Sequence, residues 1–136
     1  MLLQPKKQKY RRQQKARTAP RIAYRGAKLA FGNFGLQAAS AGRISSAQLE
    51  AARKAITHNL KREGKVWIRV FPDKPVTKFP AEVKMGKGKG ALSHYVAPVE
   101  KGRIMFEIGG VDGERAREAL RRAAHKLPVK GKIITK

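Results

Sequence analysis

The stretch RISSAQLEAARKAITHNLKREGK, residues 43–65, has the clearest periodic pattern in the chain. Ser45 is placed to cap a helix, and Gln48 is placed to reach back and complete a capping box. An apolar stripe follows at helical spacing and consists of Leu49, Ala52, Ile56 and Leu60. Gly64 supplies a stop signal. The stretch therefore predicts an amphipathic helix that packs its apolar side on another layer of the fold.

Strand patterns lie on both sides of this helix. Residues 29–36 carry apolar side chains interrupted by Gly32 and Gly35, which predicts a strand with a bend or bulge. Residues 65–71 alternate, so that one face presents Val66, Ile68 and Val70 and the other presents Trp67, Arg69 and Phe71. The prolines within residues 72–80 exclude a central strand there and predict a loop or a sheet edge.

The C-terminal half predicts two more strands, a second helix and a final strand. Residues 92–99 and 103–108 are short strand candidates, and the connection EKG between them predicts a hairpin. The second helix begins at the cap Asp112 and is limited by Pro128. Its stripe consists of Ala116, Ala119, Leu120, Ala123 and Leu127. Residues 129–135 complete an α+β fold, in which two helices pack on a mixed, largely antiparallel sheet.

The charge of the chain is strongly one-sided. Lys and Arg number 32 against nine Asp and Glu, which gives a formal net charge of +23. Self-repulsion of this size works against a compact state, so it indicates a polyanionic partner, nucleic acid first and an anionic membrane second. With 41% apolar residues the chain can still bury a small core. We therefore expect one globular domain, residues 29–136, preceded by a basic arm, residues 1–28.

The arm is free of acidic residues, because the first in the chain is Glu50. It has few large apolar side chains, so we expect it to be flexible in free solution. It lacks the apolar middle of a secretory signal and the serines of a mitochondrial presequence, which favours a functional arm. Tyr10 and Tyr24 can stack on bases. The arm residues expected to bind RNA are Lys6, Lys7, Lys9, Tyr10, Arg11, Arg12, Lys15, Arg17, Arg21 and Arg25. On the first helix, the cations expected to form a second contact surface are Lys54, Lys61 and Arg62.

The stretch KMGKGKG, residues 84–90, alternates glycine with lysine. It is not a Walker loop, because no serine or threonine follows a Gly-Lys pair, and it is not a dinucleotide fingerprint, because its glycines are spaced by two and lead into a strand. A flexible glycine hairpin with solvated lysines remains one interpretation. In this basic chain we favour a loop that brings backbone N–H groups close to a phosphate. Its residues are Lys84, Met85, Gly86, Lys87, Gly88, Lys89 and Gly90.

Residues suited to catalysis are few in the sequence. There is no cysteine, and the three histidines, His58, His94 and His125, fall in different predicted elements. No G-x-S-x-G or comparable nucleophile context is present. We therefore expect no catalytic residue, no metal, no cofactor and no small-molecule substrate, and we do not expect an enzyme. No apolar run reaches the length of a membrane span.

Several segments together resemble a known family. They are the opening MLLQPKKQKYRR, the segments FGNFGLQA and AQLEAARKAI, the block GKVWIRVFPDKPVTKFPAEVKMGKGKG at residues 64–90, and the end AREALRRAAHKLPVKGKIIT. In this order they are similar to the bacterial-type family of large-subunit ribosomal protein L-sixteen, over nearly the whole chain. The resemblance implies an α+β domain with a basic extension that binds ribosomal RNA.

The resemblance also implies a location and a role. The family sits below the central protuberance of the large subunit, near the elbow of the aminoacyl-site tRNA, and joins late in assembly beside neighbouring ribosomal proteins. It helps shape the tRNA site and the peptidyl-transferase region without supplying catalytic groups. Residues 6–28 would then thread among ribosomal RNA helices, and residues 84–90 would face the functional core near the tRNAs.

Two departures from the family pattern stand out. The family usually has arginine before Met-Gly, which some bacteria hydroxylate, and this chain has Lys84. Where the family commonly has Glu-Tyr-Trp-Val, this chain has Ser-His-Tyr-Val at residues 93–96. Between a bacterial cytoplasm and an organelle, these departures favour the ribosome of a mitochondrion or plastid.

Two alternatives remain beside a ribosomal RNA scaffold. One is a free-standing basic protein of nucleic acids or of anionic membranes, although the alanine-rich helix faces suit packing on a sheet better than insertion into lipid. The other is a nucleotide-dependent enzyme, which saturable binding of ATP or GTP would indicate.

Overall fold

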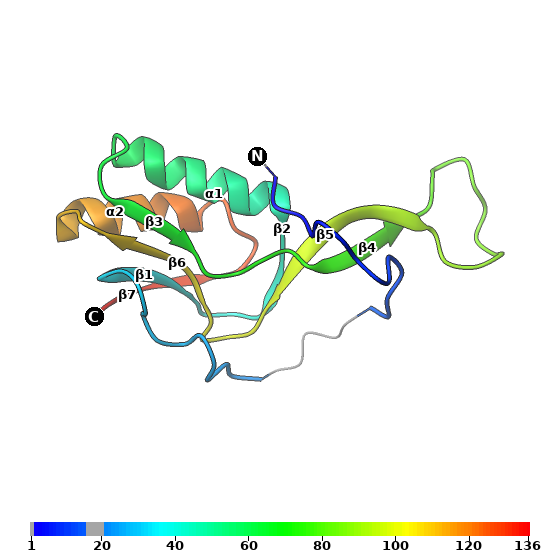
Figure 1. The fold of residues 1–136 in the computed structure, drawn as a ribbon, viewed down its shortest axis with the longest axis horizontal. Coiled ribbons are helices and arrows are strands. Elements are labelled where there is room, and N and C mark those ends of the chain that lie inside the picture. Colours follow the sequence, from blue (N-terminus) through cyan, green and yellow to red (C-terminus); the bar gives the residue numbers. More distant parts are fainter. Residues whose placement is uncertain (1, 16–20) are drawn as a thin grey trace.

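The computed structural model describes residues 2–15 and 21–136 of the chain. The elements in chain order are β1 (Phe34–Ala38), β2 (Gly42–Ser45), α1 (Ser46–Asn59), β3 (Lys65–Ile68), β4 (Lys74–Lys78), β5 (Ala91–Val99), β6 (Ile104–Gly109), α2 (Gly113–Ala124) and β7 (Gly131–Thr135). Both helices lie side by side on one side of the sheet that contains β1 (Figure 1). The predicted α+β class is confirmed, and Arg17 lies outside the described residues.

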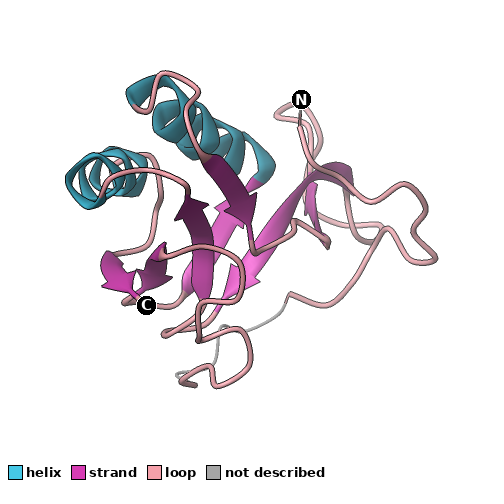
Figure 2. Ribbon diagram, turned by 60° about the vertical axis from the view of Figure 1, so that its left-hand side comes forward, coloured by secondary structure: helices cyan, strands magenta, loops and turns pink. Residues whose placement is uncertain are grey.

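The strands form two sheets instead of the single sheet that we expected. One has the order β3-β6-β1-β7 and the other has the order β2-β5-β4, and every strand pair in both is antiparallel (Figure 2). A bulge interrupts the pairing of β1 with β6 between Leu36 and Gln37. The helices pack on the first sheet, whereas the second sheet extends toward the glycine–lysine loop, residues 84–90 (Figure 1).

Helix α1 begins with the predicted capping box. The Ser45 hydroxyl accepts a hydrogen bond from the Gln48 backbone N–H at 3.3 Å, and the Gln48 side chain accepts one from the Ser45 N–H at 2.9 Å. The predicted stripe is fully buried in the core. The helix ends at Asn59, before Gly64, because Lys61 and Arg62 adopt left-handed backbone conformations with φ of 51° and 65°. These two cations therefore lie beyond the helix and not on its polar face.

Helix α2 packs on α1 through small side chains. Asp112 caps it, accepting from the Glu114 N–H at 3.3 Å. The side chains that α2 buries are Ala116, Ala119, Leu120 and Ala123, as the stripe predicts, whereas Leu127 lies beyond the end of the helix at Ala124 and is partly buried. Because alanine is short, the two helix backbones can approach closely over this core. On the exposed side of α2, Glu118 and Arg122 form an ion pair at 3.0 Å, four residues apart.

The predicted hairpin of residues 92–108 is wrong. β5 and β6 belong to different sheets, and the turn between them bonds to other segments. The Lys101 carbonyl accepts from the Ala23 N–H at 2.7 Å, and the Gly102 N–H donates to the Ala38 carbonyl at 2.7 Å. Gly102 has φ of 93°, a conformation that suits glycine. These bonds redirect the chain from one sheet to the other instead of closing β5 on β6.

Three further segments, residues 29–33, β2 and β4, can be compared with the predicted strands. Residues 29–33 are not part of a strand. The N–H groups of residues 30–32 donate to the Glu107 carboxylate, and it is the Asn33 N–H that donates to the neighbouring strand, at the Ile108 carbonyl at 3.0 Å. β2 was not predicted from the sequence at all. The proline-containing β4 pairs with β5 alone among the named strands, so it is a sheet edge as expected.

The described parts of the basic arm run along the surface of the domain (Figure 1). The Leu3 carbonyl accepts from the Ser46 hydroxyl at 2.7 Å, and the Gln8 side chain donates to the Asp73 carbonyl at 3.1 Å. Ala23 is buried and bonded to the Lys101 carbonyl. The arm thus has defined contacts with the body, while a domain boundary at residue 29 stays a prediction.

Candidate nucleic-acid interface

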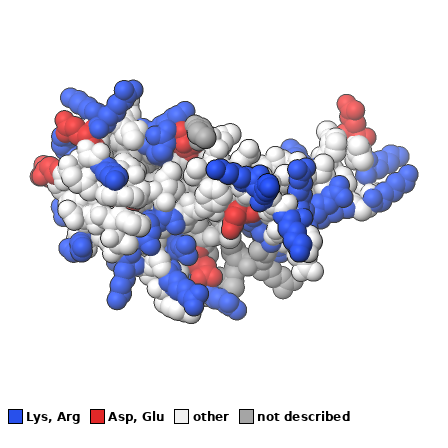
Figure 3. Space-filling model, viewed as in Figure 1, with Lys and Arg blue, Asp and Glu red and all other residues white. Residues whose placement is uncertain are grey.

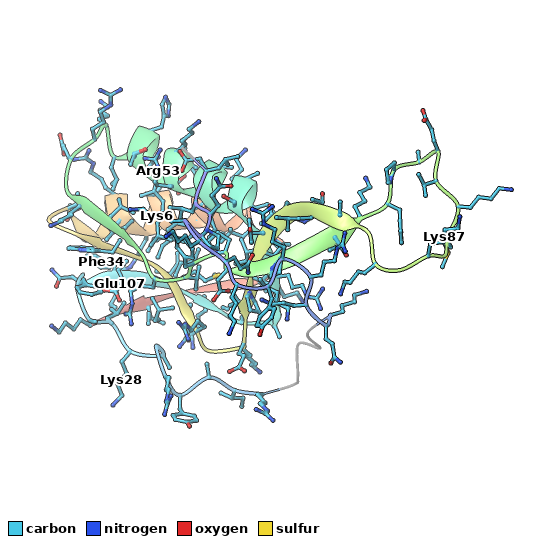
Figure 4. All side chains as sticks on the ribbon, turned by 45° about the vertical axis from the view of Figure 1, so that its right-hand side comes forward. Lys6, Lys28, Phe34, Arg53, Lys87 and Glu107 are labelled. Atoms are coloured by element: carbon cyan, nitrogen blue, oxygen red, sulfur yellow. The ribbon has the colours of Figure 1, made fainter. Side chains whose placement is uncertain are left out.

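The connection between β4 and β5 projects from the body, with Lys87 near its tip (Figure 4). Gly86, Lys87 and Gly88 have φ of 134°, 57° and 101°. No atom would lie within 4 Å of a Cβ added at Gly86 or Gly88, and Met85 is 93% exposed. The backbone of this tip is therefore reachable by a large partner from several sides, as phosphate contact through N–H groups requires.

One arm segment follows the start of β5. The arm cations beside Leu92 are Lys6, Lys7, Lys9, Arg11 and Arg12, and Tyr10 lies with them, exposed and with the Lys9 ammonium 5.5 Å from its ring centre. Lys89, at the base of the loop, donates to the Gln13 carbonyl of the arm. The fold therefore brings the first part of the arm and the glycine–lysine loop together, as one continuous basic surface.

A hollow of about 300 Å³ lies where this arm segment meets the two strands. Its cations are Lys15, Arg43, Lys74 and Lys89, and the described residues that line it include no acid. These four positions are far apart in the sequence. The hollow suits a phosphate group, because several cations converge on a small volume. Lys74 was missed from the sequence, where only its place in an edge strand gives any signal.

Arg21 and Arg25 lie in a separate hollow with Tyr24, Glu100 and Arg103. Lys54 is exposed on α1, and Lys61 and Arg62 follow the end of that helix, at the opposite end of the molecule from the basic loop (Figure 1). The structure therefore brings the predicted residues together in two groups around the arm and loop. It does not join the helix cations to either group.

Several glutamate side chains form ion pairs with arginines. Glu50 pairs with Arg53 at 2.6 Å, and this hydrogen bond lowers the pKa of Glu50 to about 2 although burial acts in the opposite direction. Glu107 pairs with Arg69, and Glu63 pairs with Arg115 at 2.5 Å. On the face in Figure 3, Lys and Arg side chains are more widespread than Asp and Glu side chains, over both the body and the projecting end. Such a surface attracts a polyanion.

In the described ranges 2–15 and 21–136, no group of three or more His, Asp and Glu side chains is placed to hold a metal ion. No helix in the same ranges is both long and apolar enough to cross a bilayer.

An α+β domain with a basic arm and a projecting glycine–lysine loop defines a class of basic proteins with a polyanionic partner. The family model for ribosomal protein L16p/L10e matches residues 5–134. The chain belongs to this family of ribosomal proteins, whose members bind ribosomal RNA. The resemblance drawn from the sequence is thereby confirmed.

Curated relatives match the amino-acid sequence of the chain over nearly its full length. The chain is 55% identical over 135 residues to the large ribosomal subunit protein uL16 of Francisella tularensis subsp. holarctica (strain OSU18), which covers 99% of this chain and 98% of that protein. It is 54% identical over the same length to the proteins of that name from subsp. novicida (strain U112) and subsp. tularensis (strain SCHU S4 / Schu 4). These relatives are bacterial, and they give no support to a free-standing membrane or nucleic-acid protein.

Proposed function

We propose that the chain is a structural constituent of the large ribosomal subunit, binds its RNA, and helps shape the aminoacyl-tRNA site and the peptidyl-transferase region. The names of its relatives and its family support the assignment to the large subunit. The observation that carries the RNA contact is the joining of the arm to the projecting loop through Lys89 and Gln13.

Affinity in this proposal comes mainly from phosphate neutralisation. The hollow beside Lys74 and Lys89 presents several cations, and the described residues that line it include no acidic side chain. Each phosphate contact to RNA releases counterions and steepens the salt dependence of binding by about 0.7–0.9 in a plot of log K against log salt. The fold then orients these contacts, because the sheets hold the arm and loop in a fixed relation.

The tRNA contact is the most specific part of the proposal. The loop extends away from the helices, and this position supports a contact with a partner at a distance from the body (Figure 1). We assign residues 84–90 to the side that faces the tRNAs, and the arm and body to ribosomal RNA and neighbouring ribosomal proteins. The aminoacyl-site tRNA is the partner that the family resemblance suggests.

We base the proposed cellular compartment on the organisms of the relatives. The departures at Lys84 and residues 93–95 favour an organellar ribosome, but the relatives described above are bacterial and do not support that preference. We therefore propose a ribosome of the bacterial cytoplasm as the location.

Sedimentation of the tagged, full-length chain in a sucrose gradient tests the large-subunit assignment. We expect it to travel with the large subunit, and a chain that stays at the top of the gradient at low salt would refute the proposal. Binding to deproteinised large-subunit RNA tests the electrostatic part. Replacing the arm residues Lys6, Lys7, Arg11 and Arg12 with glutamine should lower the salt slope by about three.

A further inference from the structure

An aromatic pair lies on the side of the β3-β6-β1-β7 sheet that faces away from the helices. The rings of Phe31 and Trp67 are stacked, with centroids 5.9 Å apart and planes 18° from parallel. The Arg69 guanidinium lies 5.4 Å from the centre of the Phe31 ring. Phe31 remains 61% exposed even though it makes these contacts. A large part of its surface is therefore open to a partner.

The backbone holds Phe31 in this exposed position. The N–H groups of Ala30, Phe31 and Gly32 donate to the buried Glu107 carboxylate at 3.1, 2.7 and 2.7 Å. A Cβ at Gly32 would lie 2.5 Å from the Ile108 carbonyl oxygen, so only glycine permits this path of the chain. The ring is thus fixed before any partner arrives, which lowers the entropy cost of binding to it.

A groove of about 860 Å³ opens beside the pair. Its lining includes Phe31, Trp67, the half-exposed Phe71 and Arg103. This volume falls within the range of about 300–1,000 Å³ that is typical of ligand sites. Arg103 also lines the neighbouring hollow that contains Arg21 and Arg25. A path of cations therefore leads from the arm to the exposed aromatic rings.

We propose that Phe31 and Trp67 form a stacking site for one unstacked nucleobase of ribosomal RNA, with Arg103 contacting an adjoining phosphate. The inference rests on the proposed RNA-binding function. Charge favours RNA. The Lys65 ammonium lies 5.4 Å from the Trp67 ring centre, and the described residues that line the groove include two arginines, Arg69 and Arg103, against one acid, Asp73. Stacking accepts any base, so the site selects an unpaired nucleotide and not a sequence.

The single tryptophan of the chain supplies a direct test. The full-length protein is titrated with a short uridine oligonucleotide, whose bases are unpaired, and separately with an RNA duplex of equal charge. We expect the oligonucleotide to quench Trp67 fluorescence and the duplex to bind without comparable quenching. Saturation by the oligonucleotide with no change in fluorescence, or equal quenching by both probes, would overturn the proposal and leave the groove to a protein partner.

Matched variants separate stacking from packing and from charge. Phe31→Leu keeps apolar bulk without a ring, and Phe31→Tyr keeps the ring. We expect Phe31→Leu to bind the oligonucleotide about tenfold more weakly with an unchanged salt slope, and Phe31→Tyr to bind as the parent does. Wild-type affinity in Phe31→Leu would refute the stacking site. If the parent protein shows no salt-dependent RNA binding at all, then the proposed function itself fails.

Discussion

Arg69, the residue after β3, and Glu107, in the middle of β6, form an ion pair beside the segment that follows the arm. Glu107 is fully buried, and its remaining acceptor capacity is filled by the N–H groups of residues 30–32. Burial alone would raise its pKa, but the hydrogen bonds from Gly32, Arg69, Phe31 and Ala30 outweigh it and lower the pKa. A buried pair is favourable only when it is this completely hydrogen-bonded.

Replacing Glu107 with glutamine should therefore destabilise the protein by about 3 kcal/mol at neutral pH, because the Arg69 charge loses its partner. The pH dependence follows from the lowered pKa. The contribution of the carboxylate is complete above the ordinary glutamate value of 4.5 and is lost as the pH falls through the lower folded-state pKa. Urea unfolding over an acidic pH series should show a larger loss in the parent than in the variant, because the variant keeps only the other carboxylates of lowered pKa, such as Glu50.

The partly exposed Glu118 offers a control for that experiment. It pairs with Arg121 and Arg122 on the surface of α2, so Glu118→Gln should change the unfolding free energy little. Equal stability of Glu107→Gln and Glu118→Gln at neutral pH would contradict a stabilising role for the buried pair.

Removing the capping box of α1 should lower the unfolding free energy by less than Glu107→Gln does. Ser45→Ala removes the acceptor for the Gln48 N–H and should lower the unfolding free energy by about 1 kcal/mol. Ser45→Asp keeps an acceptor at the same position, so most of the stability should return. Chemical denaturation of the three proteins measures both differences. An aspartate variant as unstable as the alanine variant would show that the loss comes from something other than the cap.

The alanine contact between the helices predicts intolerance of larger side chains. Ala119 is fully buried, whereas Ala51 is exposed on α1. Ala119→Leu should cost about 1–3 kcal/mol through overpacking, and the matched Ala51→Leu should be nearly neutral. The thermal unfolding temperatures of the two variants and the parent measure this difference. If Ala119→Leu unfolds at the parent temperature, then the helices are not as closely packed as the structure indicates.

Replacing the lysines of the glycine–lysine loop should change RNA binding without changing the stability of the fold. Lys84, Lys87 and Lys89 are exposed, so replacing all three with glutamine should leave the unfolding free energy unaltered. The salt slope for large-subunit RNA should fall by about two, as expected when three phosphate contacts are lost. An equal loss of charge at the exposed Lys126, Lys130 and Lys132 is the control. The same slope change in both variants would mean that only net charge matters.

Local rules explain why much of the fold could be predicted. The capping box, the apolar stripes and the cap at Asp112 depend on residues within one or two turns of each other, and the structure contains all of them. The edge position of β4 follows from its proline, which cannot donate to a ladder. The hairpin prediction failed because its outcome depends on Ala23 and Ala38, which are distant in sequence from the turn.

The amino-acid sequence by itself determined the basic character of the chain, its two helices and its family, because composition and short-range spacing carry that information. Only the tertiary structure decided which cations meet, since Lys15, Arg43, Lys74 and Lys89 come from four separate segments. It likewise placed Phe31 on Trp67 through the buried carboxylate of Glu107. Such contacts depend on long-range chain packing, and no local pattern of residues specifies them.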